Sequence, residues 1–134
     1  MGMATVAKGK ASVLLIVEDD REMRSLLCDE LCGPGYQLRE ARDGDEAFVA
    51  VLQSVPDLIL TDLRMPAGGD DYISRLRTVA PRCPIVVITG FGDAALKARV
   101  LKAGANAYFD KPVRMVDLKK CVQELLGHGS GVDS

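Results

Sequence analysis

The stretch VLLIVEDD at residues 13–20 places five strongly apolar residues directly before three acidic ones. A continuous apolar run of this length is typical of a central parallel β-strand, which is covered on both faces. Residues 58–60 and 85–88 form similar apolar runs, whereas residues 36–41 and 107–109 are shorter or mixed with polar side chains. We therefore expect three central strands and two edge strands.

Amphipathic segments alternate with these runs and predict a helix after each strand. We expect the helices near residues 23–31, 43–52, 72–79, 93–103 and 113–126. Their apolar positions at helical spacing should face the core, and these are Met23, Leu26, Leu27, Leu31, Ala47, Phe48, Val51, Leu52, Leu118, Val122 and Leu125. Strands that alternate with helices indicate an α/β fold with a parallel sheet.

The composition is that of a single globular domain. The 134 residues are 48% hydrophobic and 27% charged, and we expect a domain at 12–127 between a flexible leader, 1–11, and a flexible tail, 128–134. The formal charge of −2 lacks the basic excess of nucleic-acid-binding proteins, so direct binding of nucleic acid by this chain is not expected. Since no apolar run approaches the ~20 residues of a membrane-spanning helix, no membrane association is expected either.

The four cysteines predict a reduced, cytoplasmic protein. Cys28, Cys32, Cys83 and Cys121 show neither the clustering of a disulfide framework nor CxxC spacing. Cys28 and Cys32 are four residues apart, but no histidine or second cysteine pair accompanies them in the sequence. Buried free cysteine usually behaves as a small hydrophobic residue, and we interpret these in that way.

Polar residues gather where the expected strands end. Glu18 and Asp19 follow the first strand, Asp62 the third, Thr89 the fourth and Lys111 the fifth. Open α/β sheets bind ligands at the carboxyl ends of their strands, at the point where the strand order reverses. If the second strand lies outside the first, right-handed crossovers place the first and third strands side by side. Asp19 and Asp62 would then face one crevice.

Carboxylates that converge in one crevice repel each other and require a compensating cation. Their oxygen ligands suit Mg²⁺, which takes one or two carboxylates together with phosphate oxygens. Lys111 adds a mobile positive charge and Thr89 a hydroxyl donor, both suited to a transferring phosphoryl group. Each residue alone is weak evidence, and Asp20 in the same acidic run is expected to be a helix N-cap. The combination at successive strand ends indicates a phosphate site whose nucleophile could be a carboxylate.

Together these residues resemble a known family, the receiver domain of bacterial two-component response regulators. The resemblance spans about residues 12–126 and rests on IVEDD at 16–20, LTDLRMP at 60–66, VITG at 87–90, AGA at 103–105 and KP at 111–112. It implies a flavodoxin-like, doubly wound fold with a five-stranded parallel sheet in strand order 2-1-3-4-5 and five helices. The receiver would be either a stand-alone regulator or part of a hybrid histidine kinase or multidomain regulator.

The resemblance also assigns an acceptor and a metal site. Asp62 would accept a phosphoryl group from a phosphohistidine on a histidine kinase or a histidine phosphotransfer protein. Mg²⁺, for which Mn²⁺ can substitute, would be held by Asp19, Asp62 and the backbone carbonyl of Arg64, and by Glu18 through a water molecule.

Further roles follow from the same resemblance. Thr89 and Lys111 would contact the phosphoryl group, Tyr108 would be the switch aromatic, and Pro112 is a candidate cis-proline. Arg64 and Phe91 lie where the family tunes water access to the phosphoaspartate, so we expect slow self-dephosphorylation. Phosphorylation would shift a population of conformers at the surface formed by residues 93–103, 107–109 and 113–126, which is also where a homodimer could form.

Two other functions stay open at this point. A small aspartyl-phosphate magnesium phosphatase would need a second acid near the nucleophile and a lid over the substrate. Asp62 is instead followed by Leu63 and Arg64, and no insertion is long enough for a lid. A degenerate receiver that serves only as a docking or dimerisation module would not need Asp62, Asp19, Thr89 and Lys111. We therefore expect a regulatory phosphoacceptor rather than an enzyme.

Overall fold

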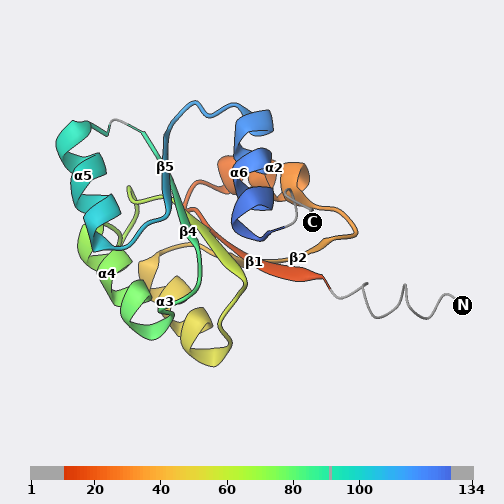
Figure 1. The fold of residues 1–134 in the computed structure, drawn as a ribbon, viewed down its shortest axis with the longest axis horizontal. Coiled ribbons are helices and arrows are strands. Elements are labelled where there is room, and N and C mark those ends of the chain that lie inside the picture. Colours follow the sequence, from red (N-terminus) through yellow and green to blue (C-terminus); the bar gives the residue numbers. More distant parts are fainter. Residues whose placement is uncertain (1–10, 91, 128–134) are drawn as a thin grey trace, which may run out of the picture.

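In a computed structural model of the chain, which describes residues 11–90 and 92–127, one parallel sheet lies between two layers of helices (Figure 1). The strands are β1 (Ser12–Val17), β2 (Tyr36–Ala41), β3 (Leu58–Thr61), β4 (Ile85–Thr89) and β5 (Ala107–Asp110). The helices are α2 (Arg21–Leu31), α3 (Gly44–Gln53), α4 (Asp70–Val79), α5 (Ala94–Ala103) and α6 (Met115–Leu125). The strand order is β2-β1-β3-β4-β5, which confirms the predicted flavodoxin-like architecture and its two edge strands.

The strand register aligns the carboxyl ends of the strands at one edge of the sheet. Val17, the last residue of β1, pairs with Ala41 of β2 on one side and with Thr61 of β3 on the other. Thr89 of β4 pairs with Asp110 of β5 in the same way. The chain order reverses between β1 and β3, so the residues that follow these two strands flank the crevice where such folds bind ligands.

Alternate residues of each central strand enter two separate cores. On β1, Leu14 and Ile16 pack with α2 and α6, whereas Leu15 and Val17 pack with α3, α4 and α5. These four side chains are at most 1% exposed, as expected for a strand that is covered on both faces. The helices accordingly lie in two layers, with α3, α4 and α5 on one side of the sheet and α2 and α6 on the other (Figure 1).

Helix boundaries follow the capping residues in the sequence. The Asp20 side chain accepts a hydrogen bond of 3.1 Å from the Met23 backbone N–H, which confirms the predicted N-cap of α2. Asp43 and Asp93 cap α3 and α5 in the same way. Gly104 ends α5 with a φ of 128°, a conformation that glycine adopts readily.

Two residues of the predicted apolar stripes are not buried. Leu26 is 44% exposed and Leu52 is 59% exposed, so the prediction that they face the core was wrong. The buried positions are Leu27 and Leu31 on α2 and Ala47 and Val51 on α3. Because neighbouring residues of a helix differ by about 100° around its axis, Leu26 and Leu52 are rotated away from the sheet.

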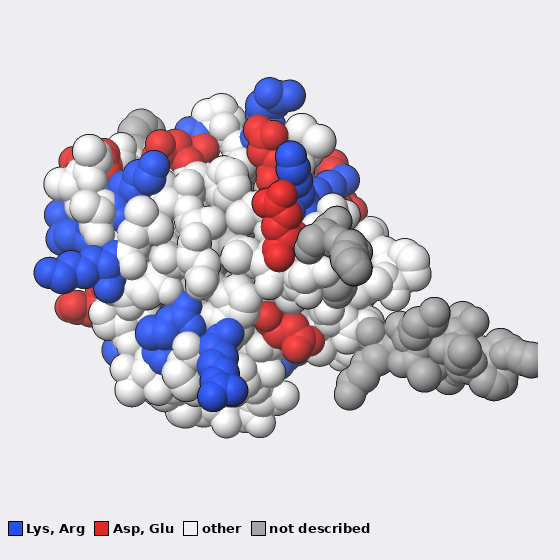
Figure 2. Space-filling view, in the orientation of Figure 1, with Lys and Arg blue, Asp and Glu red and all other residues white. Residues whose placement is uncertain are grey.

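The surface carries charges of both signs. Acidic and basic side chains are interspersed on the face shown in Figure 2, with several of the basic ones toward the α4 and α5 side. Within the described residues, no helix is both long enough and apolar enough to cross a membrane. The predicted leader and tail, residue 11 apart, lie outside the described residues.

Candidate functional site

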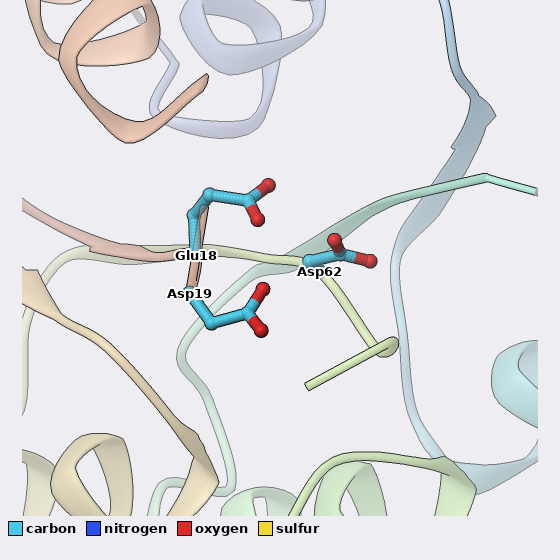
Figure 3. Close-up of side chains that lie close together, drawn as sticks. All are labelled: Glu18, Asp19 and Asp62. Carbon is cyan, nitrogen blue, oxygen red and sulfur yellow. The ribbon is translucent and has the colours of Figure 1, made fainter. Parts of the chain in front are cut away.

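Three carboxylates meet at the crevice between β1 and β3. Glu18 and Asp19 directly follow β1, and the backbone N–H of Asp62 donates a 3.0 Å hydrogen bond to the Val17 carbonyl at the end of that strand. One carboxylate oxygen from each of Glu18, Asp19 and Asp62 lies within 4.8 Å of the others. The Glu18 and Asp19 side chains project from the end of β1 toward the side on which the Asp62 carboxylate lies (Figure 3). The strand-end pattern in the sequence therefore corresponds to a real cluster.

Lys111 joins two of these carboxylates from the end of β5. Its Nζ donates to Glu18 Oε1 and to Asp62 Oδ2, each at 2.9 Å. Glu18 is 2% exposed and Asp62 is 5% exposed, so both charges are largely removed from water. The backbone N–H of Lys111 donates to the Thr89 carbonyl at 2.9 Å, which fixes where the side chain begins. A single ammonium group thus offsets two buried carboxylates.

Backbone donors hold the other oxygen of Asp62. Its Oδ1 accepts hydrogen bonds from the backbone N–H groups of Leu63, at 2.6 Å, and Arg64, at 3.1 Å. Burial alone would raise the pKa of Asp62, but the hydrogen bonds from Lys111 and from the Arg64 backbone outweigh it and lower the pKa. Asp62 is therefore ionised at neutral pH and available as a nucleophile.

The pKa values of the two other charged groups, Glu18 and Lys111, are both raised. Burial raises the pKa of Glu18, and its hydrogen bond with Lys111 only partly compensates. Burial would lower the pKa of Lys111, yet its bonds to Asp62 and Glu18 raise the pKa overall. Lys111 consequently stays a cation at neutral pH, and Glu18 is the one of the two buried carboxylates whose pKa is raised.

The donor set fits a hard divalent cation. It consists of carboxylate oxygens, two of them buried and the third, Asp19, exposed at the mouth of the site. Within the described part of the chain no other group of three acidic, cysteine or histidine residues has this geometry. Oxygen-only ligands with one side open to water are what Mg²⁺ requires, because it retains several water molecules.

Two hydroxyl groups near the site lack hydrogen-bond partners among the described residues. Thr89 is fully buried, and its Oγ1 lies close enough to Asp62 to contribute to the lowered pKa without a well-formed hydrogen bond. The Tyr108 hydroxyl is also buried, lies near Asp110 without a well-formed hydrogen bond, and is packed against Gly92, where a Cβ atom would overlap it. Tyr108 of β5 pairs with Val87 of β4. Val87 is two residues before Thr89, so the side chains of Thr89 and Tyr108 lie on the same face of the sheet.

The other predicted site residues have mixed placements. The Arg64 side chain is exposed, and the Lys111–Pro112 peptide bond is cis. Phe91 lies outside the described residues. Lys111 and Pro112 also line a mostly apolar pocket with Met23, Leu26, Gly90, Val113 and Met115.

Some residues around the site were not identified from the sequence. Arg24 donates to the Glu18 carbonyl at 2.7 Å and to Glu40 Oε1 at 3.0 Å, so it ties the acidic turn to β2. Its position one helical turn after Asp20 was an available signal, because that spacing returns a side chain to the same face. Thr61 and Tyr72 form a buried hydroxyl pair next to Asp62, and no motif or spacing indicated this contact.

Comparisons with known proteins agree with this architecture. The family model described as the response regulator receiver domain matches residues 14–123. The transcriptional regulatory protein ZraR of Salmonella typhimurium is 32% identical over 122 residues, which are 90% of this chain and 27% of ZraR. The chain therefore spans only about a quarter of that relative's length.

Solved structures show the same similarity. A response regulator receiver domain protein from Methanospirillum hungatei matches with a TM-score of 0.84 and 26% identity, over 88% of this chain and 95% of that one. The receiver domain of a signal transduction histidine kinase from Syntrophus aciditrophicus matches with a TM-score of 0.80 and 31% identity, over 92% and 96% of the two chains.

Proposed function

Because the chain belongs to the response regulator receiver domain family, we propose that it is a signalling switch that Asp62 activates by accepting a phosphoryl group. The observation that carries this proposal is the environment of Asp62. Its carboxylate is 5% exposed, is ionised at neutral pH, and lies 2.9 Å from the Lys111 ammonium group. Asp62 is therefore a positioned nucleophile, and the neighbouring ammonium group can stabilise the negative charge on the transferred phosphoryl group.

The donor in this proposal is a phosphohistidine on a histidine kinase or a histidine phosphotransfer protein. A carboxylate oxygen of Asp62 attacks the phosphorus atom, and the P–N bond breaks with its electron pair remaining on the imidazole nitrogen. A solvent proton completes the neutral histidine. Lys111 then exchanges one of its carboxylate contacts for a phosphoryl oxygen, and the Thr89 hydroxyl, which has no partner among the described residues, donates to another.

Mg²⁺ fits the same site. Asp19, Asp62 and the backbone carbonyl of Arg64 would hold the ion, and Glu18 would bind one of its water molecules. When bound, the ion neutralises charge on the phosphoryl oxygens. Within the chain, Glu18 and Asp19 orient toward that position, and Arg24 holds the backbone between β1 and α2 through the Glu18 carbonyl.

The output in this proposal is a change at the surface formed by α5, β5 and α6. Thr89 moves toward the phosphoryl group, and the Tyr108 ring, on the same face of the neighbouring strand, rearranges with it. The phosphorylated state then favours one of two conformations of this surface, which can bind a downstream partner or a second copy of the chain.

One labelling experiment tests the assignment. Wild type, Asp62→Asn and Asp45→Asn are incubated with Mg²⁺ and a small acyl phosphate, and the intact mass is followed. Asp45 is an exposed acid on α3 that is not part of the carboxylate cluster, so Asp45→Asn makes the same chemical change without altering Glu18, Asp19 or Asp62. We expect one added phosphoryl mass on wild type and Asp45→Asn and none on Asp62→Asn. Equal labelling of Asp62→Asn would refute the role of Asp62.

A further inference from the structure

A buried pair of hydroxyl groups lies directly beneath Asp62. Thr61 is the last residue of β3, and Tyr72 lies in the first turn of α4. Their hydroxyl oxygens are 2.9 Å apart, and the Thr61 hydroxyl donates at 2.7 Å to the backbone carbonyl of Asp62 itself. Thr61 is 1% exposed and Tyr72 is 2% exposed, so water does not compete for these bonds.

The hydrogen bonds run in one direction. Since Thr61 uses its only hydroxyl hydrogen toward the Asp62 carbonyl, the hydrogen between the two side chains must come from Tyr72. Burial strongly raises the pKa of Tyr72, so the phenol remains a donor at all physiological pH values. The chain of donors begins on α4 and ends on the main chain of Asp62, and bonds in such a chain strengthen one another.

The pair also closes a loop that carries the site. Thr61 and Tyr72 are eleven residues apart, and between them lie Asp62, Arg64 and the rest of the β3–α4 connection. This connection folds back tightly, because a Cβ atom on Gly68 would lie 2.3 Å from the Leu63 carbonyl oxygen. The helix it enters has no side-chain cap at its N-terminus. The Thr61–Tyr72 contact is therefore a side-chain bond that joins the two ends of the loop.

We propose that Thr61 and Tyr72 are positioning residues for phosphoryl transfer: their hydroxyl pair fixes the backbone of Asp62 and the start of α4. This inference rests on the proposed function of Asp62. The pair touches neither the carboxylate oxygens nor the phosphoryl group, so it acts through the orientation of the loop. A purely structural role in the core would need only the ring of Tyr72, which a phenylalanine supplies.

The test compares five variants of the full chain: Tyr72→Phe, Thr61→Val, Thr61→Ser, Thr78→Val and the double variant Thr61→Val/Tyr72→Phe. The first two remove one hydroxyl at nearly constant volume, and Thr61→Ser restores the hydroxyl without the methyl group. Thr78→Val is the control, because Thr78 is on α4 and its hydroxyl donates, among the described residues, to the Ser74 carbonyl of the same helix. Initial labelling rates are measured against acyl phosphate concentration in saturating Mg²⁺, at a temperature where circular dichroism shows every variant folded.

We expect Tyr72→Phe and Thr61→Val each to lower the maximal labelling rate about tenfold without changing the half-saturating donor concentration. A misplacement near 1 Å can cost about 10²-fold, so a smaller displacement predicts this intermediate loss. Thr61→Ser and Thr78→Val should stay within about twofold of wild type, and the double variant Thr61→Val/Tyr72→Phe should be no slower than either single variant.

Two outcomes would overturn the inference in distinguishable ways. If Tyr72→Phe and Thr61→Val lower the urea midpoint but label at the wild-type rate, the pair is structural only, and the proposed function of Asp62 stands. If wild type itself gains no phosphoryl mass, the proposed function fails, and the positioning role fails with it.

Discussion

Lys111 carries the charge balance of the site. Its Nζ contacts Glu18 and Asp62 at 2.9 Å each, and 26% of its side chain is exposed. Removal of a cation from a buried pair leaves uncompensated charge, which costs far more than the loss of a surface ion pair. The same mobility that a partly exposed lysine retains would let it move to a phosphoryl oxygen.

Replacement of Lys111 by methionine should therefore destabilise the protein when no divalent ion is present. We expect the free energy of unfolding at pH 7 to fall by about 2 kcal/mol, less than for a fully buried pair because Lys111 is partly solvated. The pKa values of Asp62 and Glu18 should both rise, since each loses its nearest cation. Urea unfolding in the presence of a chelator measures the first effect.

Lys119→Met provides the matched control. Lys119 bonds Glu30 at 2.9 Å, as closely as Lys111 bonds its partners, but both side chains are more than a third exposed. Its loss should cost less than about 1 kcal/mol. Equal losses for the two variants would show that burial of the carboxylates does not govern this site.

The start of α3 supports the site from the side. Asp43 caps the helix by accepting from the Glu46 N–H at 2.8 Å, and Glu46 reaches back to the Arg42 N–H at 2.8 Å. The Gly44 N–H donates to the Pro66 carbonyl at 3.0 Å, and a Cβ atom on Gly44 would overlap the Ala67 carbonyl. The N-terminus of α3 is thus in direct contact with the loop that follows Asp62.

This arrangement predicts a pH-dependent contribution from Glu46. Its bonds to Arg42 lower its pKa below the ordinary value of 4.5. The stability that it contributes is therefore present above about pH 4.5 and is lost as the pH falls through its folded-state pKa. We expect Glu46→Gln to cost about 0.5 kcal/mol at pH 7, a small value because Glu46 is largely solvated.

Urea unfolding of wild type and Glu46→Gln between pH 7 and pH 3.5 measures this difference, which should shrink toward zero at the acidic end. Glu22→Gln is the comparison, because Glu22 also lies in the first turn of a helix, α2, and has no bond to arginine in the described structure. A Glu46→Gln difference that stays constant with pH would exclude a charge-dependent contact.

The sequence predicts helix and strand features well where the conformation of a residue depends on its neighbours in the chain. Asp20 is the N-cap that the sequence predicted, because capping depends on a few adjacent residues. Leu26 and Leu52 were assigned wrongly because burial depends on how each helix is rotated against the sheet within its apolar face. Apolar spacing along the helix does not contain that information.

The same distinction applies to the site. Glu18, Asp62 and Lys111 were predictable because all follow strands, and parallel strands bring such residues to one edge. The contact between Thr61 and Tyr72 depends on how α4 is rotated against the sheet. The sequence pattern indicates which face of the helix is buried but not its precise rotation. Contacts of this kind are visible only in the folded molecule.

The strands that end at the carboxylate site also contribute to both hydrophobic cores. β1 and β3 contribute side chains to both cores, and the acidic residues follow directly from these two strands. A ligand that binds the carboxylates therefore stabilises the sheet on which both helix layers pack. Such a ligand binds only the folded chain, because the three carboxylates are far apart in an unfolded one.

Mg²⁺ should accordingly raise the global stability of the protein. At ten times its dissociation constant, an ion that binds only the folded state adds about 1.4 kcal/mol to the free energy of unfolding. We expect this gain for wild type and for Asp45→Asn, and its loss for Asp19→Asn and Asp62→Asn, which each remove one carboxylate from the cluster. Urea unfolding with MgCl₂ or with KCl at equal ionic strength separates ion binding from general screening. If Asp19→Asn and Asp62→Asn gain as much stability from Mg²⁺ as wild type does, the ion binds elsewhere, and the carboxylates at the ends of β1 and β3 are not its ligands.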